Sequence, residues 1–125
     1  MHQSRLGAIV IDCQTPEDFA ANAAFWAEAL GLTKSPHQPD DRYVSLTGPE
    51  GEVRVIIQNV EHEPRVHLDI ETDNKEAEAQ RLIALGAKPV GKVKSWHVLE
   101  APSGHRFCLI GPTRAGFLEK ANAWD

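Results

Sequence analysis

Two polar residues, His67 and Asp69, stand two positions apart in the stretch RVHLDIETD at residues 65–73. The stretch alternates apolar and polar residues as a β-strand does, so both side chains are expected on one face. A histidine beside a carboxylate can act as a base with an orienting partner, and the same residue types can bind a metal ion. Alternatively, His67 is a core histidine whose hydrogen bonds are satisfied, and Asp69 has no functional relation to it. The pair alone leaves these alternatives open.

The strand that carries this pair has an earlier counterpart in the chain. IVIDCQT at residues 9–15 matches VHLDIET at residues 66–72, so Asp12 takes the place of Asp69. Each copy precedes an amphipathic helical pattern that ends in ALG, where glycine suits the left-handed C-terminal cap. We expect Thr15 to cap the first helix, and Thr72 or Asp73 to cap the second. The repeat predicts two strand–helix units of the same design.

Short strand patterns follow each helix, and their turns also match. Gly48-Pro49-Glu50-Gly51 aligns with Ala101-Pro102-Ser103-Gly104, which predicts a hairpin at the end of each half. This alignment places Trp96 at the position of Tyr43. The predicted unit is therefore βαβββ, written twice, at about residues 6–60 and 65–111. A short helix is expected at about residues 114–123.

Composition limits the class of protein. A chain of 125 residues is one domain, spanning residues 1–125, and 42% hydrophobic with 25% charged residues is typical of a globular protein. A formal net charge of −5 disfavours nucleic acid as a partner. No apolar run has the length of a membrane span, and the N-terminal residues lack a signal-peptide layout, so we expect a cytoplasmic protein and no membrane partner. The two cysteines are expected to remain thiols.

These features resemble the vicinal oxygen chelate superfamily, and more narrowly its small glyoxalase-like proteins. The doubled βαβββ unit, the LGA after the helix, HLDI in the mid-chain strand and the final PSGHRFCLI carry the resemblance. It implies an α+β fold in which two βαβββ repeats form curved mixed sheets around a central cup, with the helices outside. Relatives of this kind include glyoxalase I, bleomycin-resistance proteins and extradiol dioxygenases, so the fold does not select a reaction.

The resemblance also implies four metal-ligand positions, on the first and last strands of each unit. They fall on His67, on Cys108 and, through the repeat, on Val10 and Val55. Gln58 can replace Val55 only if the strand is bulged or in another register. Two valines cannot bind a cation, and His67 with Cys108 offers too few ligands. We therefore expect no metal and no other cofactor, with a divalent metal as the alternative.

The cup that the resemblance implies is expected to contain the remaining polar residues. His67 is the candidate acid or base and Asp69 its catalytic partner, while the expected substrate-binding residues are Asp12, Gln58, Trp96, Arg106 and Cys108. Asp12 and Asp69 can instead be symmetric structural residues, paired with Arg106 or capping loops. Trp96 can instead belong to the core.

Three functions fit these expectations, and the sequence does not decide whether the protein is an enzyme. It can sequester a small organic molecule, it can catalyse a metal-free isomerase or lyase step with His67, or it can be a metal-dependent glyoxalase-type lyase or dioxygenase. Because metal ligands are missing at the expected positions, the metal-dependent lyase or dioxygenase is kept as the alternative function. The first helix is rich in alanine, and the resemblance implies pockets built between two copies of the chain, so we also expect a homodimer.

Overall fold

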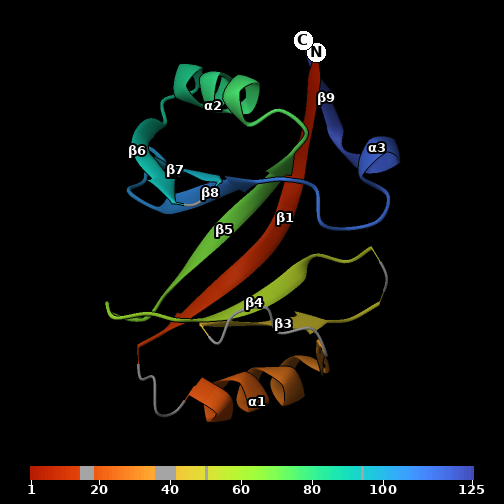
Figure 1. Ribbon diagram of the computed structural model, residues 1–125, viewed down its shortest axis with the longest axis vertical. Coiled ribbons are helices and arrows are strands. Elements are labelled where there is room, and N and C mark those ends of the chain that lie inside the picture. Colours follow the sequence, from red (N-terminus) through yellow and green to blue (C-terminus); the bar gives the residue numbers. More distant parts are fainter. Residues whose placement is uncertain (15–18, 36–41, 50, 94) are drawn as a thin grey trace. The chain divides into compact units, whose positions relative to one another are not determined.

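The order of helices and strands repeats the predicted βαβββ unit (Figure 1). The computed structural model describes residues 1–14, 19–35, 42–49, 51–93 and 95–125. The expected cap at Thr15 lies outside these residues. The first copy consists of β1 (His2–Cys13), α1 (Phe19–Leu30), β2 (Thr33–Lys34), β3 (Tyr43–Thr47) and β4 (Arg54–Asn59). The second copy consists of β5 (Arg65–Thr72), α2 (Lys75–Ala84), β6 (Lys88–Val93), β7 (Trp96–Glu100) and β8 (Arg106–Ile110).

The chain divides into two compact units. The first unit is Ala8–His67, and the second unit is Met1–Gly7 together with Leu68–Asp125. The division passes through β1 and β5, so the start of β1 belongs to the second unit and the start of β5 to the first. None of the helices that the structure describes has the length and apolar character needed to cross a membrane.

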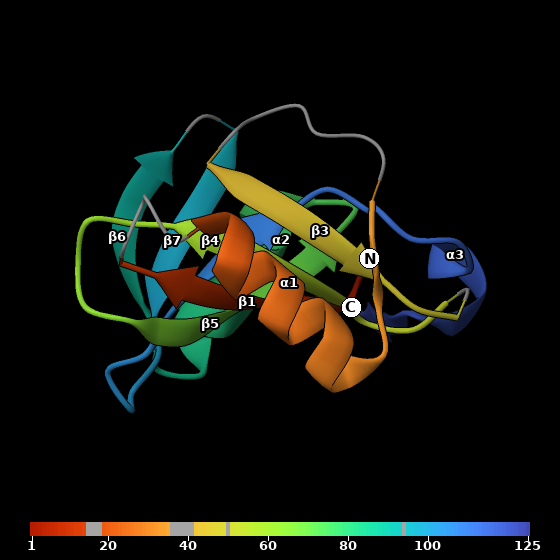
Figure 2. The ribbon, with the colours of Figure 1, turned by 90° about the horizontal axis from the view of Figure 1, so that it is seen from below.

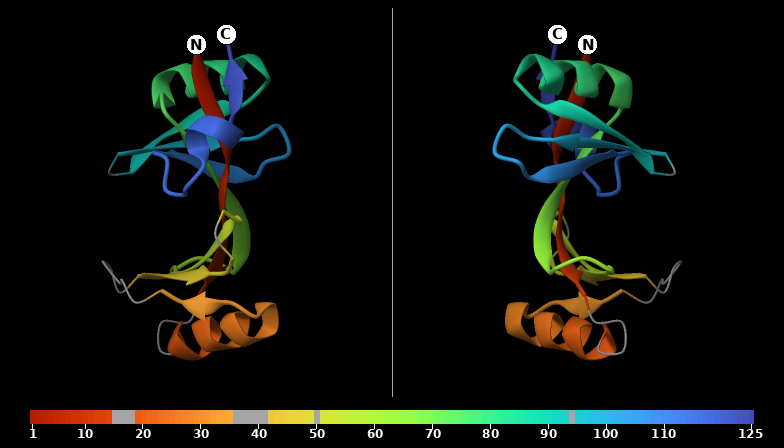
Figure 3. Two further views of the ribbon diagram at one scale, coloured as in Figure 1. Left: turned by 90° about the vertical axis from the view of Figure 1, so that its right-hand side faces the viewer. Right: turned by 90° about the vertical axis from the view of Figure 1, so that its left-hand side faces the viewer.

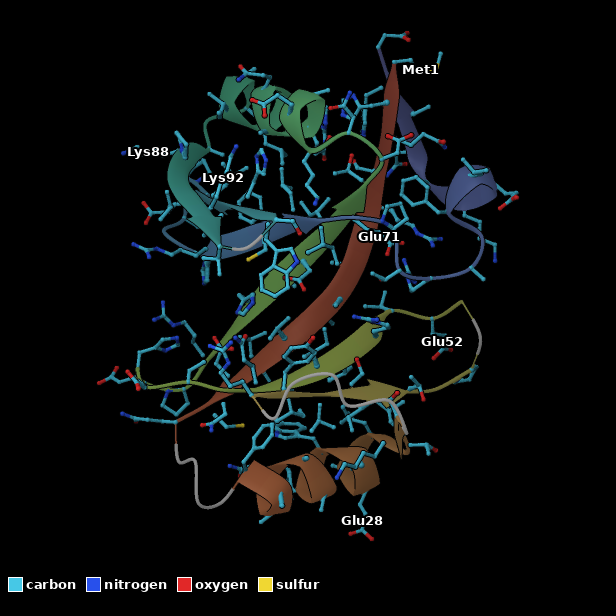
Figure 4. The ribbon with its side chains drawn as sticks, in the orientation of Figure 1. Met1, Glu28, Glu52, Glu71, Lys88 and Lys92 are labelled. Atoms are coloured by element: carbon cyan, nitrogen blue, oxygen red, sulfur yellow. The ribbon has the colours of Figure 1, made fainter. Side chains whose placement is uncertain are left out.

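In the first unit, the strand order is β2-β3-β4-β1. β1 and β4 run parallel, with Val10 opposite Ile56 and Asp12 opposite Gln58, and β3 pairs antiparallel with β4. α1 lies across these strands (Figure 2). Cys13, Ala23, Val44, Leu46 and Ile57 form the core beneath it. Glu28 points away from the strands (Figure 4), as expected for the polar side of a helix that covers one sheet face.

The opposite face of this sheet carries a different set of side chains. Ala8, Val10 and Ile56 form a buried cluster there, and Tyr43 packs against it. Because side chains alternate along a strand, Asp12 shares this face with Val10, and Gln58 shares it with Ile56. The face turned away from α1 therefore combines an apolar patch with polar residues at its end.

The second unit has the strand order β5-β8-β7-β6, with β5 and β8 parallel. Asn74 caps α2, since its side chain accepts a hydrogen bond from the Ala77 N–H at 3.0 Å. The expectation of Thr72 or Asp73 as cap was wrong. Thr72 Oγ1 donates to the Gln3 carbonyl and Asp73 Oδ1 accepts from the Gln3 N–H, each at 2.8 Å. Both side chains hold the start of β1 instead.

The chain end differs from the expected helix at residues 114–123. α3 is confined to Phe117–Lys120, and β9 (Asn122–Trp124) follows it and pairs antiparallel with the start of β1. The Trp124 indole N–H donates to Ser4 Oγ at 2.8 Å, which fixes the strand. The two chain ends consequently lie side by side (Figure 3). Long-range pairing overrides the helical pattern in this short segment.

Two buried glutamates stabilise the second unit. Glu71, on β5, is fully buried and lies beside the loop from β8 to α3 (Figure 4). Its carboxylate accepts from Arg5, and from the N–H and hydroxyl of Thr113 at 3.0 and 2.9 Å. Burial alone would raise the pKa of Glu71, but these hydrogen bonds outweigh it and lower the pKa. Glu78 is held in the same manner by Arg81 and His2, and its pKa is lowered too.

Candidate active site

The first unit brings together the end of β1 and the start of β5 through one hydrogen bond. His67 Nδ1 lies 3.1 Å from Asp12 Oδ2. Asp12 is 3% exposed and the His67 side chain 18% exposed, so the pair is shielded from bulk water but still reachable. Asp12 and Val10 are two residues apart on β1 and share a face, so the His67–Asp12 pair lies on the sheet face opposite α1. The residue that orients the His67 ring is therefore Asp12.

The direction of this hydrogen bond sets the chemistry of the ring. A carboxylate only accepts hydrogen bonds, so His67 donates through Nδ1–H. In a neutral imidazole with a proton on Nδ1, the lone pair is on Nε2. A second oxygen of the same carboxylate, Asp12 Oδ1, is buried without a hydrogen-bond partner among the residues the structure describes. A buried carboxylate with an unused oxygen is costly, which is common at functional sites and rare elsewhere.

A further histidine, His62, approaches the same carboxylate. Its Nε2 lies 3.8 Å from Asp12 Oδ2, and its side chain is 42% exposed. His62 also lines an open pocket of about 410 Å³ together with Glu63, Pro64 and Arg65. Two imidazoles thus converge on one oxygen, one of them shielded and the other open to a pocket. The sequence offers no signal for His62, because it stands in the crossover before β5, where strand parity assigns no face.

The register of β4 changes the assignment of one expected ligand position. Gln58 is the Cα partner of Asp12, and Cys108 is the Cα partner of Asp69. Since Asp12 and Asp69 are counterparts in the repeat, Gln58 is the counterpart of Cys108. The expectation of Val55 was wrong, and Val55 packs in the core on the α1 face.

The same register moves the counterpart of Tyr43. Tyr43 lies opposite Gln58, whereas Val98 lies opposite Cys108, so Val98 takes the place expected for Trp96. Aligning the hairpin turns misled the comparison because the β3–β4 connection is longer than the β7–β8 connection. Parallel pairing with the first strand of each unit identifies Gln58 and Cys108 as counterparts, and the register of each hairpin then determines the residue opposite them.

The other expected site residues belong to the second unit. Asp69 is 9% exposed and opposite Cys108, which is half-buried. Arg106 is exposed, with its Nε 3.8 Å from Glu100 Oε1. Trp96 is half-buried at the start of β7, opposite Val93. Cys13 and Cys108 are both in the thiol form.

The residues of the first unit match a divalent metal site incompletely. Val10 is 2% exposed within the apolar cluster and has no donor atom. At the ligand positions that the repeat assigns, Gln58 and His67 supply a neutral carboxamide and an imidazole, which do not balance the charge of a divalent cation. The hydrogen bond from His67 to Asp12 would also orient a metal-bound imidazole, so the mismatch rests on the ligand set and not on this contact.

Comparison with known proteins agrees with this fold. A family model described as a glyoxalase-like domain matches residues 8–110. A glyoxalase/bleomycin resistance protein/dioxygenase superfamily member from Vibrio splendidus 12B01 is 18% identical, with a TM-score of 0.53, over 86% of this chain and 99% of that one. No protein in the curated set matches.

Two dioxygenases share the fold over part of their length. The 2,3-dioxygenase LapB from Pseudomonas sp. KL28 is 19% identical, with a TM-score of 0.58, over 97% of this chain and 46% of that one. A variant of homoprotocatechuate 2,3-dioxygenase from B. fuscum is 16% identical, with a TM-score of 0.61, over 94% of this chain and 35% of that one. The chain thus spans less than half of each dioxygenase, and the likeness concerns the fold. With the doubled βαβββ order and the match over residues 8–110, the chain belongs to the glyoxalase-like domain family.

Proposed function

We propose that this protein binds a small organic molecule on the sheet face of the first unit opposite α1, and that His67 moves a proton on it without a catalytic metal. The observation that carries the proposal is the hydrogen bond from His67 Nδ1 to the buried Asp12 Oδ2, at 3.1 Å. A histidine oriented by a buried carboxylate is the usual arrangement for general acid–base catalysis.

The proposed chemistry follows from the protonation of the ring. Nε2 of His67 takes a proton from an acidic C–H or O–H of the bound molecule, and Asp12 stabilises the imidazolium that forms. Return of this proton to a neighbouring atom completes an isomerisation, and its delivery to a departing group completes an elimination. In both cases His67 ends the cycle as it began, so no oxidant or reductant is needed.

His62 supports a route for proton exchange with solvent. It approaches the same oxygen, Asp12 Oδ2, at 3.8 Å and opens on the pocket of residues 62–65. The His62 side chain is 42% exposed and the His67 side chain 18%, so His62 can pass protons to water while His67 stays shielded.

Two other functions remain as alternatives. A sequestering protein would use the same face for binding and show no proton transfer. A metal-dependent lyase or dioxygenase is favoured by one observation, because the register places Gln58 at the position that the repeat relates to Cys108. Against it stands Val10, which cannot bind a cation at another of the expected positions.

The test is deuterium exchange on bound molecules. Compounds with an acidic C–H are first screened for binding by thermal shift, and hits are then incubated in D2O and followed by proton NMR. Wild type is expected to catalyse exchange. His67→Gln should bind the same hits but lose catalysed exchange, and Asp12→Asn should slow it by about 10²- to 10⁴-fold.

A matched control and two opposing outcomes complete this experiment. His105→Gln alters an exposed turn histidine and should exchange like wild type. Exchange that survives in His67→Gln would refute the role of His67. Exchange that chelation abolishes and added metal restores would replace the proposal by the metal-dependent alternative.

We further propose that the protein is a homodimer, as its relatives commonly are. The outer face of α1 supports this, because Phe25 is 60% and Leu30 47% exposed beside several alanines. Light scattering at micromolar concentration should give twice the chain mass, and Phe25→Lys should give the monomer. A monomer mass for wild type would refute it.

Cytoplasmic location stays a prediction.

A further inference from the structure

Arg54 stands at the start of β4, on the same sheet face as the proposed site. It has the parity of Ile56, which belongs to the apolar cluster opposite α1, and its Cα partner on β1 is Ala8. Its side chain is half-buried, and its Nε is fully buried. Arg54 is therefore placed on the proposed binding face and not among the solvated charges of the surface.

One N–H group of the Arg54 guanidinium, at Nε, is buried. Nε has no hydrogen-bond partner among the residues that the structure describes. Three other shielded arginines that the structure describes each face a glutamate: Arg5 donates to Glu71, Arg81 donates twice to Glu78 at 2.8 Å, and Arg114 Nε lies 3.5 Å from Glu71 Oε1. A buried N–H without an acceptor costs free energy, so a structure that retains one is expected to use it.

The position of Arg54 relative to the His67–Asp12 pair indicates what kind of molecule could contact both. Arg54 lies opposite Ala8 and Gln58 lies opposite Asp12, so four residues of strand separate the two ends of the face. This corresponds to roughly 13 Å between main-chain positions, and the long arginine side chain can shorten it. Tyr43 and Ile56 lie along the same face. A molecule with one anionic end and an apolar middle matches this sequence of groups.

We propose that the ligand is an organic monocarboxylate, and that Arg54 binds its carboxylate while His67 acts on an acidic C–H or O–H nearer the other end. The inference rests on the proposed function and adds the substrate class. The guanidinium presents N–H groups in a planar fork that matches a carboxylate. A single negative charge matches the single charge of the Arg54 guanidinium, whereas a dianion such as a phosphate monoester would leave charge uncompensated on a largely apolar face.

Binding of matched acid and amide pairs tests this class. The probes are 3-phenylpropanoate and 5-phenylpentanoate, each compared with its primary amide by titration calorimetry at pH 7.5. Wild type is expected to bind the acids about 10- to 100-fold more tightly than the amides. Arg54→Gln should lose this preference and bind both forms alike. The NMR signal of the Arg54 Nε–H should shift with acid but not with amide.

Control variants separate this inference from the proposed function. Lys34→Gln removes an exposed cation of the same unit and should keep the wild-type preference. His67→Gln should keep the preference as well, although it loses deuterium exchange. An acid preference that survives in Arg54→Gln, or equal binding of acid and amide to wild type, would overturn the role of Arg54 and leave the proton-transfer proposal standing. Failure of both acids to bind wild type would overturn the monocarboxylate class, while the proton-transfer proposal keeps its own test by deuterium exchange.

Discussion

His67 donates through Nδ1 to Oδ2 of Asp12 over 3.1 Å, although the two residues lie 55 positions apart in the chain. The contact joins a strand that opens the first repeat to the strand that opens the second. Asp69, two residues along, keeps its own place opposite Cys108 in the second unit. The carboxylate that orients the histidine is thus the one from the other repeat.

Asp12→Asn is expected to leave stability unchanged or raise it slightly. The carboxylate of Asp12 is 3% exposed and one of its oxygens has no partner in the described part of the chain, so the native charge is poorly compensated. An amide of the same shape removes the cost of burying that charge. Calorimetry at pH 7.5 should show a melting temperature equal to wild type or a few degrees higher.

Glu71→Gln is the contrasting variant, because the Glu71 carboxylate is fully satisfied. It accepts from Arg5 and from Thr113, and the change leaves Arg5 buried beside a neutral amide. A loss of about 3–5 kcal/mol in the free energy of unfolding is expected. If Asp12→Asn costs as much as Glu71→Gln, Asp12 is a structural residue and the catalytic assignment fails.

Stability should fall on acidification because of the two buried glutamates. The pKa of Glu71 and that of Glu78 are lowered in the folded protein, below the value of about 4.3 of an unfolded chain. Their contribution is therefore fully present above about pH 4.3 and is lost as the pH falls through the folded pKa values. Urea midpoints measured from pH 7 to pH 3 should drop in this window. The drop should be smaller in Glu78→Gln, and an unchanged slope in that variant would contradict the assignment.

The two thiols should react at different rates. Cys13 is 8% exposed in the core beneath α1, and burial, followed by the nearby charge of Asp12, raises the pKa of its thiol. Less thiolate at a given pH means slower attack on a disulfide reagent. At pH 8, Cys108→Ser should leave a thiol that reacts at least about ten times more slowly than the faster thiol of wild type. Equal rates would show that α1 does not cover Cys13.

Gly7→Ala should destabilise the second unit. A Cβ on Gly7 would lie 3.2 Å from the Glu71 nitrogen and 3.3 Å from the Asp69 carbonyl oxygen, both backbone atoms that cannot give way cheaply. A loss of about 1–3 kcal/mol is expected from urea unfolding. Gly91→Ala is the matched control, because a Cβ there meets no atom within 4 Å and the change should be neutral. A neutral Gly7→Ala would contradict the close approach of β1 to β5.

The doubled unit was predictable because its signals are local. The alternation in IVIDCQT and VHLDIET, the helical stripes and the two ALG endings each report on neighbouring residues. They led to the βαβββ order and to the glyoxalase-like resemblance. What failed depended on distant partners. Thr72 and Asp73 hold β1 and leave the cap to Asn74, and β9 exists because Trp124 reaches Ser4.

The candidate site was partly predictable for the same reason. His67 and Asp12 could be named because strand parity and the repeat assign them a face, whereas the repeat pointed to Val55 and admitted Gln58 only in another register. The register that relates Gln58 to Cys108 could not, since it depends on parallel pairing between strands far apart in sequence. The roles proposed for His62 and Arg54 have no signal in the sequence. One stands in a crossover, and the other is notable only because a buried nitrogen lacks an acceptor.

The most direct test of the central claim is the nitrogen NMR spectrum of the His67 ring, recorded on protein labelled in its imidazoles and purified without a histidine tag. At pH 8 we expect Nδ1 of His67 to carry the proton and Nε2 to carry none. Asp12→Asn should abolish this tautomer preference. One equivalent of zinc, nickel, iron or manganese should leave the spectrum unchanged. The purified protein should contain far less than equimolar metal. A near-equimolar metal that disappears in His67→Ala, or a shift of His67 Nε2 on addition of one of these ions, would contradict it.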